Sequence, residues 1–220
     1  DFMIRQHVVR GVSAPVAVGL LLLMGCSGKG DIIPMNLTPK AKEATSASPA
    51  VKPMPGPKVV VIPFEDARAD HARVGSRSSM WGGETDFHVS SGSAGEATGQ
   101  AFADYLKRNG WLVQYQKVAP QESETGPSIV LSGKILDLTV DAKRGFVMTD
   151  VEARSKLVIQ ANNREDGSSI VRTDAHSGSQ DNVFWFEPQD GEELLAEVLE
   201  KNFERFVLNT KLEDRSIRFR

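Results

Sequence analysis

The chain has 220 residues, a formal net charge of −3, 25% charged residues and a single cysteine. This length suits one domain with an ordinary hydrophobic core. The charge balance excludes the dense basic surface with which proteins neutralise nucleic-acid phosphates, and one cysteine excludes an intrachain disulfide. We therefore expect no nucleic-acid partner.

The N-terminal segment has the layout of an export signal. Arg5 and Arg10 form a positive flank, and residues 11–23 are small or apolar and carry no charge. A positive flank followed by a short apolar stretch is typical of a secretory signal peptide. The stretch is shorter than the ~20 apolar residues that a transmembrane helix needs. We predict a signal peptide over residues 1–25.

The signal segment ends in Leu23-Met24-Gly25-Cys26, which resembles the lipobox of bacterial lipoproteins. The resemblance implies cleavage before Cys26, a diacylglycerol thioether on its sulfur, and acylation of the new amine by a fatty acid such as palmitate. Ser27 rather than aspartate follows, which in lipoproteins implies the outer membrane, with the folded part facing the periplasm. The alternative, a cysteine buried in an apolar helix, is disfavoured because the sequence turns polar directly after Cys26.

The next segment, residues 26–57, has the composition of a tether. It is rich in Pro, Ala, Ser and Lys without periodicity, so it cannot bury enough surface to offset its ordering entropy. Roughly 20 flexible residues would let a domain stand about 25–60 Å from a membrane. Within it, residues 32–39 look extended, and the sequence leaves open whether they join a sheet edge.

A single domain is predicted over residues 58–212, followed by a C-terminal tail at 213–220. Its first half is expected to contain a buried strand, a long polar loop, a helix capped by Ser91 or Ser93, and a second strand. These elements span residues 58–64, 65–90, 94–109 and 111–116.

Three longer strands and a second helix complete the predicted domain. Their ranges are 128–141, with a bulge near Gly133, 146–162, 169–178 and 190–208. In the middle strand, apolar residues at alternate positions indicate one buried face: Val151, Ala153, Leu157 and Ile159. The order β–α–β–β–β–β–α predicts an α/β protein, an α+β sandwich in which two main helices pack on one face of a mixed, largely antiparallel sheet.

Three motifs resemble the YajG-type family of bacterial lipoproteins. They are Asn36-Leu37-Thr38-Pro39, the stretch VVVIPFEDARADHARVGSR at residues 59–77, and Leu106-Lys107-Arg108-Asn109-Gly110. There is a more distant similarity to periplasmic domains of curli-export and penicillin-binding-protein-activator lipoproteins. The resemblance covers roughly residues 31–140. It implies an outer-membrane lipoprotein and carries over no catalytic residue.

The polar segment 65–90 holds the candidate chemistry. Asp66, Asp70, His71 and His88 carry ligand atoms, but no two of them have the helical spacing of a metal motif, so a solvated loop is favoured. Asp66 is predicted to cap a turn and to pair with Arg68 or Arg77. No nucleophile elbow or phosphate-binding glycine pattern is present. We expect no enzymatic activity, catalytic residue, metal or cofactor.

The consecutive aromatics Phe184, Trp185 and Phe186 cannot all face one core from a strand, so at least one should be exposed or pack under the final helix. A staple before the helix, with Phe184 and Phe186 inward, is favoured over a protein or glycan contact. The predicted partner-binding residues are Asp66, Arg68, Arg77, Trp81 and Trp185. The predicted function is that of an outer-membrane-anchored, non-enzymatic binding or assembly module that contacts another envelope protein. The alternatives are a small-ligand or glycan-binding periplasmic domain, and an accessory subunit of an envelope transport or secretion complex. The sequence leaves the oligomeric state open.

Overall fold

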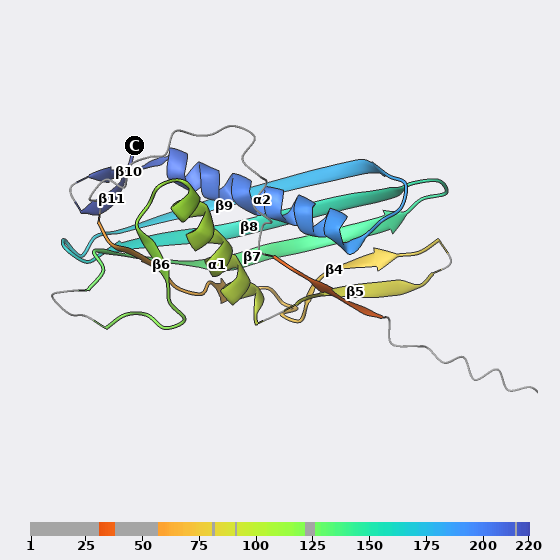
Figure 1. Cartoon of the computed structure of the whole chain (residues 1–220), viewed down its shortest axis with the longest axis horizontal. Helices are drawn as coiled ribbons and strands as arrows, with labels where there is room; N and C mark the ends of the chain where they lie inside the picture. Colours follow the sequence, from red (N-terminus) through yellow and green to blue (C-terminus); the bar gives the residue numbers. More distant parts are fainter. Residues whose placement is uncertain (1–30, 38–56, 81, 91, 122–125, 214) are drawn as a thin grey trace, which may run out of the picture.

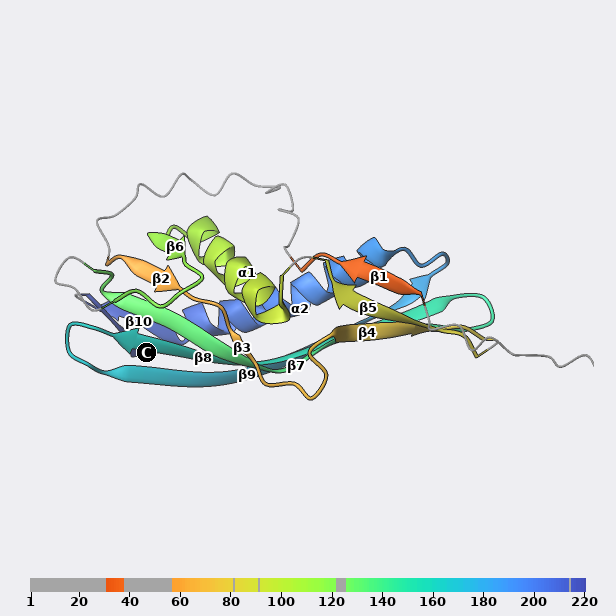
Figure 2. The same ribbon diagram turned by 90° about the horizontal axis from the view of Figure 1, so that it is seen from below.

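The computed structural model describes residues 31–37, 57–80, 82–90, 92–121, 126–213 and 215–220. Nine strands form one sheet, and helices α1 (Ala94–Arg108) and α2 (Pro188–Leu208) lie on the same side of it (Figure 1, Figure 2). The sheet is mixed: its two longest pairings are antiparallel, and several short strands add to it in parallel. The predicted α+β fold with two helices on one face is confirmed.

Three long strands, β7 (Ile129–Arg144), β8 (Thr149–Asn163) and β9 (Ser169–Val183), form an antiparallel meander under α2. Every second residue of β8 is buried, including the four apolar residues predicted to face the core. The predicted bulge near Gly133 lies instead between Ile135 and Asp137. Gly133 has a packing role, because a Cβ there would come within 2.5 Å of the Phe64 ring.

The other edge of β7 is covered by three short strands that follow one another along its length. They are β2 (Val59–Val61), β3 (Glu65–Asp66) and β4 (Arg73–Ser78), and each runs parallel to β7. Residues 59–78 therefore behave as one interrupted strand along β7, as Figure 2 shows. Beyond β2 lies β6 (Val113–Tyr115), which is also parallel to it.

The prediction of a long loop over residues 65–90 is wrong. Strand β4 pairs antiparallel with β5 (Glu84–Val89), so most of this segment is a β-hairpin. Val74 and Phe87 are fully buried and fix the hairpin on the core, whereas most of the other side chains are polar and at least partly exposed. Gly75 has a φ of +144°, and a Cβ there would overlap the carbonyl oxygen of Val140 at 1.8 Å. With only two apolar anchors, the segment lacks the alternation by which strands are recognised.

The structure has strands beyond both ends of the predicted range 58–212, and it answers the open question about residues 32–39. Strand β1 (Ile32–Met35) pairs parallel with β5, and Met35 and Leu37 are buried, so part of the predicted tether belongs to the sheet. The predicted tail contains β11 (Ser216–Phe219), which pairs with β10 (Thr210–Glu213). The side chain of Asn163 donates to the carbonyl oxygen of the buried Ile217 at 3.0 Å and accepts from its N–H at 2.8 Å, which ties this hairpin to β8.

The core lies between the helices and the sheet. Helix α1 is capped by Ser93, whose hydroxyl accepts from the N–H of Glu96 at 3.1 Å, in agreement with the predicted cap. Phe102 of α1 is fully buried among the rings of Phe64, Phe203 and Phe206. These aromatic contacts join α1 to α2 and to the segment between β2 and β3.

Candidate interaction surface

Asp66 and Arg68 form a largely buried ion pair at the end of β3. The Nε and Nη2 atoms of Arg68 donate to the two carboxylate oxygens of Asp66, each at 2.8 Å. Its Nη1 donates to the carbonyl oxygens of Arg73 at 2.8 Å and Leu138 at 3.0 Å. The predicted pairing of Asp66 with Arg68 is confirmed. Because the guanidinium holds β3, the start of β4 and β7 together, this pair has a structural role.

The environment keeps the Asp66 carboxylate ionised. Burial alone would raise the pKa of Asp66, but the hydrogen bonds and charge of Arg68, helped by His71, outweigh it and hold the pKa below the ordinary 3.8. His71 Nδ1 lies 3.4 Å from an Asp66 oxygen, and the imidazole is otherwise exposed. An exposed histidine at this distance adds little to the bidentate arginine pair.

Arg77 lies elsewhere. It is opposite Ala142 on β7, whereas Asp66 is opposite Ile135, which is seven residues or roughly 20 Å away along the strand. The Arg77 guanidinium lies 5.4 Å from the centroid of the Phe186 ring. The predicted site residues therefore fall into two groups, with Asp66 and Arg68 near the middle of β7 and Arg77 near its C-terminal end.

The aromatic segment after β9 places one side chain inward and two outward. Phe186 is buried and stacks on Phe87 with ring centroids 5.8 Å apart. Phe184 and Trp185 are 73% and 72% exposed. The prediction that at least one of the three is exposed is confirmed, and so is the inward position of Phe186, but the expected inward position of Phe184 is wrong. Arg144 lies over the Trp185 ring, 5.9 Å from its centroid, and so holds the indole at the end of the sheet.

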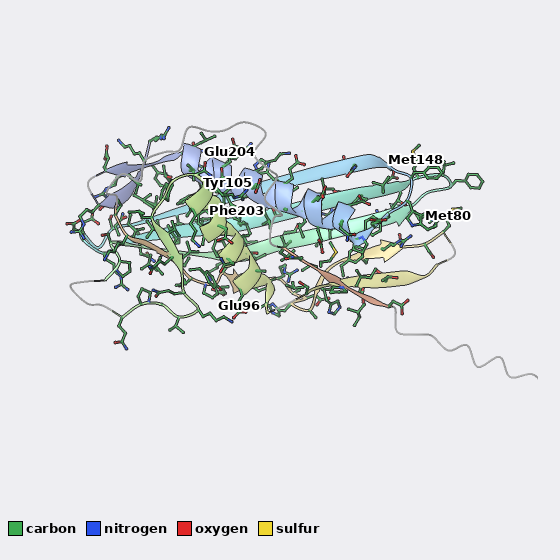
Figure 3. The ribbon with its side chains drawn as sticks, viewed as in Figure 1. Met80, Glu96, Tyr105, Met148, Phe203 and Glu204 are labelled. Carbon is green, nitrogen blue, oxygen red and sulfur yellow. The ribbon has the colours of Figure 1, made fainter. Side chains whose placement is uncertain are left out.

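Trp185 belongs to a larger exposed apolar surface, which we call the aromatic tip. The turn between β7 and β8 starts after Arg144. Two other segments end at the same level of the sheet: β9 ends at Val183, which pairs with Thr149, and β4 ends at Ser78, which pairs with Lys143. Three turns thus meet at one end of the domain, where Figure 3 labels Met80 and Met148. The tip consists of Met80, Phe146, Val147, Met148, Phe184 and Trp185, all at least 40% exposed.

Most of the aromatic tip was not found from the sequence. Phe146 was assigned to the start of a strand, but the turn includes residues 145–148 and β8 begins at Thr149. The N–H of Gly145 donates to the carbonyl oxygen of Met148 at 2.8 Å, which closes the turn. The signal was the run Phe146-Val147-Met148 directly after Gly145, because consecutive exposed apolar residues in a turn are unusual unless they have a function.

Two predicted site residues, Cys26 and Trp81, lie outside the described residues. Of the four candidate metal ligands, Asp66 and His71 lie side by side. His88 is in β5 opposite Arg73, and the Asp70 carboxylate accepts from the backbone N–H groups of Ala72 and Arg73. Among the residues that the structure describes, no group of three or more histidine, cysteine, aspartate or glutamate side chains is placed to hold a metal ion.

A cavity of about 270 Å³ lies beside the first turns of α1. Its lining includes Tyr115, Gln100, Asn36 and the ion pair between Glu96 and Lys117, whose atoms are 3.2 Å apart. The Tyr115 hydroxyl is buried and has no hydrogen-bond partner among the described residues. Burial raises the pKa of Tyr115, and the charge of Glu96 raises it further. A second cavity of about 460 Å³ lies along β2 and β6.

Within the described part of the chain, no helix is both long and apolar enough to span a bilayer.

No protein-family model and no curated protein matches the sequence. Solved structures with a similar fold include a Xanthomonas campestris protein described as DUF330, with 11% identity over 80% of this chain and 92% of that one and a TM-score of 0.48. They also include a minor lipoprotein from Acinetobacter baumannii, with 15% identity, 71% and 92% coverage and a TM-score of 0.36. A third is the lipoprotein GNA1162 from Neisseria meningitidis, with 9% identity, 69% and 99% coverage and a TM-score of 0.36.

At these identities and TM-scores, the likenesses define neither a family nor a function for this chain. The resemblance to the YajG-type family stays a prediction.

Proposed function

We propose that the protein is a lipid-anchored, non-enzymatic module of the bacterial envelope, held on the outer membrane with its domain in the periplasm. The observation that carries the proposal is the Leu23-Met24-Gly25-Cys26 sequence directly after a short apolar segment. The thiol is the group that the lipoprotein modification alkylates, and several acyl chains together give stable anchoring where one alone is marginal.

The structure changes the geometry of this anchoring. Because β1 belongs to the sheet, the link between Cys26 and the first described residue, Asp31, is five residues long. Five residues span at most about 18 Å even when fully extended. The expected stand-off of about 25–60 Å is therefore too large, and a domain anchored through Cys26 stays within about 18 Å of the bilayer surface, measured at Asp31.

The anchor is tested by replacing Cys26 with serine. Wild-type protein from a bacterial host is expected to start at an acylated Cys26, which mass spectrometry of the N-terminal peptide identifies, and to partition into the detergent phase. The Cys26→Ser protein is expected to keep residues 1–25, because processing follows thiol alkylation. As a control, Ser27→Ala leaves the thiol in place and should remain acylated. A bare Cys26 with residues 1–25 still attached would contradict the proposal.

A second candidate function, small-ligand or glycan binding, is favoured by the cavity at Tyr115. A buried hydroxyl without a partner costs free energy, and a ligand that accepts or donates a hydrogen bond there would offset this cost. A thermal-shift screen of the whole protein against sugars and small polar solutes tests this function, since a ligand at 100 times its dissociation constant adds about 2.7 kcal/mol of stability.

The same hydroxyl makes a mutational prediction. Tyr115→Phe is expected to leave the free energy of unfolding unchanged or to raise it by up to about 1–2 kcal/mol, because it removes an unsatisfied polar atom and keeps the ring. Tyr105→Phe is the matched control, as Tyr105 packs against Phe203 on the other side of α1. Urea denaturation measures both. A loss of more than about 1 kcal/mol in Tyr115→Phe would mean that the hydroxyl has a partner.

A further inference from the structure

We propose that the aromatic tip rests in the interface of the same lipid bilayer that holds Cys26, so that the domain touches its membrane at a second point. This inference depends on the proposed lipid anchor and adds to it a contact surface and an orientation of the domain.

Exposed aromatic side chains are concentrated at this end of the molecule. Among the described residues, four phenylalanine or tryptophan side chains are strongly exposed, and three of them, Phe146, Phe184 and Trp185, belong to the tip. Phe146 is 90% exposed, although it is a large apolar side chain in a tight turn. The fourth, Phe219, is in β11 at the opposite end of the domain (Figure 1). Clustering of this kind marks a surface that is covered by a partner or a membrane.

The position at which the chain enters the domain places this surface near the anchor. The carbonyl oxygen of Asp31 accepts from the N–H of Asp86 at 3.1 Å. Asp86 pairs with Ser76 of β4, and Ser76 pairs with Asp141 of β7, so Asp31 lies near the level of Asp141 along the sheet. Phe146 lies five residues beyond Asp141, which is about 15 Å farther along the strand direction. Strand β1 runs parallel to β5 and away from the β4–β5 turn, so its first residue is the one nearest the tip.

The two lengths match. An extended link brings Cys26 at most about 18 Å from Asp31, and the tip projects about 15 Å from the level of the same residue. When the link extends toward the tip, the acylated cysteine and Phe146 lie at nearly the same height. A bilayer that receives the acyl chains is then in reach of the tip.

The chemistry of the tip suits the lipid interface. Tryptophan is enriched at this depth, where its amphipathic indole meets both the headgroups and the acyl chains. Phenylalanine is among the residues by which interfacial segments insert their apolar face. Lys143 and Arg144 are exposed beside the turn, but so are Asp150 and Glu187, so the charges are mixed. Apolar insertion rather than attraction to anionic headgroups should therefore carry the contact.

Quenching of Trp185 by lipid tests the proposal. The full-length protein, purified from a bacterial host with its anchor, is reconstituted into phosphatidylethanolamine vesicles that contain brominated acyl chains, with or without phosphatidylglycerol. The fluorescence of Trp185 is obtained by subtracting the emission of the Trp185→Phe variant from that of the wild type. Trp185 is expected to be quenched, to a similar extent in both vesicle compositions.

A matched pair of variants separates the tip from general surface hydrophobicity. Phe146→Ser/Val147→Ser is expected to lose most of the Trp185 quenching, whereas Phe219→Ser/Val171→Ser at the other end should keep it. Val147 and Val171 are 59% and 53% exposed, so both variants should fold. Unquenched Trp185 in anchored wild type, or an equal loss in both variants, would overturn the inference.

The mass of the Cys26 peptide in the same samples distinguishes a failure of the tip contact from a failure of the lipid anchor. An acylated Cys26 with unquenched Trp185 removes the tip contact and leaves the lipid anchor in place. A bare Cys26 removes the proposed function and, with it, this orientation of the domain.

Discussion

The Phe102→Ala variant is expected to unfold with a free energy about 3–5 kcal/mol lower than the wild type. Phe102 is fully buried, and its ring centroid lies 4.9–6.0 Å from those of Phe64, Phe203 and Phe206. The truncation leaves a cavity where α1, α2 and the β2–β3 segment meet, so both apolar transfer and packing are lost. Urea denaturation followed by circular dichroism measures the change.

The control for this variant is Phe184→Ala, which removes the same side chain at a 73% exposed position. It should change the free energy of unfolding by no more than about 0.5 kcal/mol. Equal losses in the two variants would contradict the described packing of α1 on α2.

Replacing Arg68 with alanine is expected to cost about 3–5 kcal/mol, because it leaves the Asp66 carboxylate largely buried without its partner. The carbonyl oxygens of Arg73 and Leu138 lose their donor at the same time. Arg68→Lys should recover only part of the loss, since an ammonium group cannot make the bidentate contact. In a double-mutant cycle with Asp66→Ala, the double variant should lose less than the sum of the two single variants. Additive losses would mean that the two side chains are not coupled.

The pH dependence of this pair has a definite sign. The pKa of Asp66 is lower in the folded state than its ordinary 3.8, so its contribution to stability is present above that pH and is lost as the pH falls through the folded pKa. The stability difference between wild type and Asp66→Asn should therefore stay constant from about pH 7 to about pH 5 and shrink as the pH falls further, through the folded pKa. A difference that grew over this range would contradict the lowered pKa.

The elements with strong periodicity could be predicted from sequence. The strand around Val151–Ile159 shows a period of two, and the helix that contains Leu195, Val198 and Leu199 shows a helical stripe. Both elements were predicted, and the predicted buried face of the strand is correct. The pairing of Asp66 with Arg68 was also predictable, because two residues of separation after a strand allow a local ion pair.

The other elements could not be predicted from the sequence, because their positions depend on residues that are distant along the chain. Strand β1 is edged by polar residues and is stabilised by pairing with β5 more than 50 residues later, which no local pattern indicates. The β4–β5 hairpin has only Val74 and Phe87 as fully buried apolar anchors. The aromatic tip arises from three turns that meet only because β4, β8 and β9 are held in register by β7 and by each other.

The central place of β7 has a consequence for the order in which the chain can fold. Val59 pairs with Ile129, so β2, β3 and β4 have no partner on β7 until some 70 further residues have been synthesised. The β7–β8–β9 meander, in contrast, needs only neighbouring segments, and contacts of short sequence separation form first. Apart from local pieces such as the β4–β5 hairpin, the first half of the chain therefore cannot complete its fold until β7 has been synthesised, so the packing of both halves is completed late.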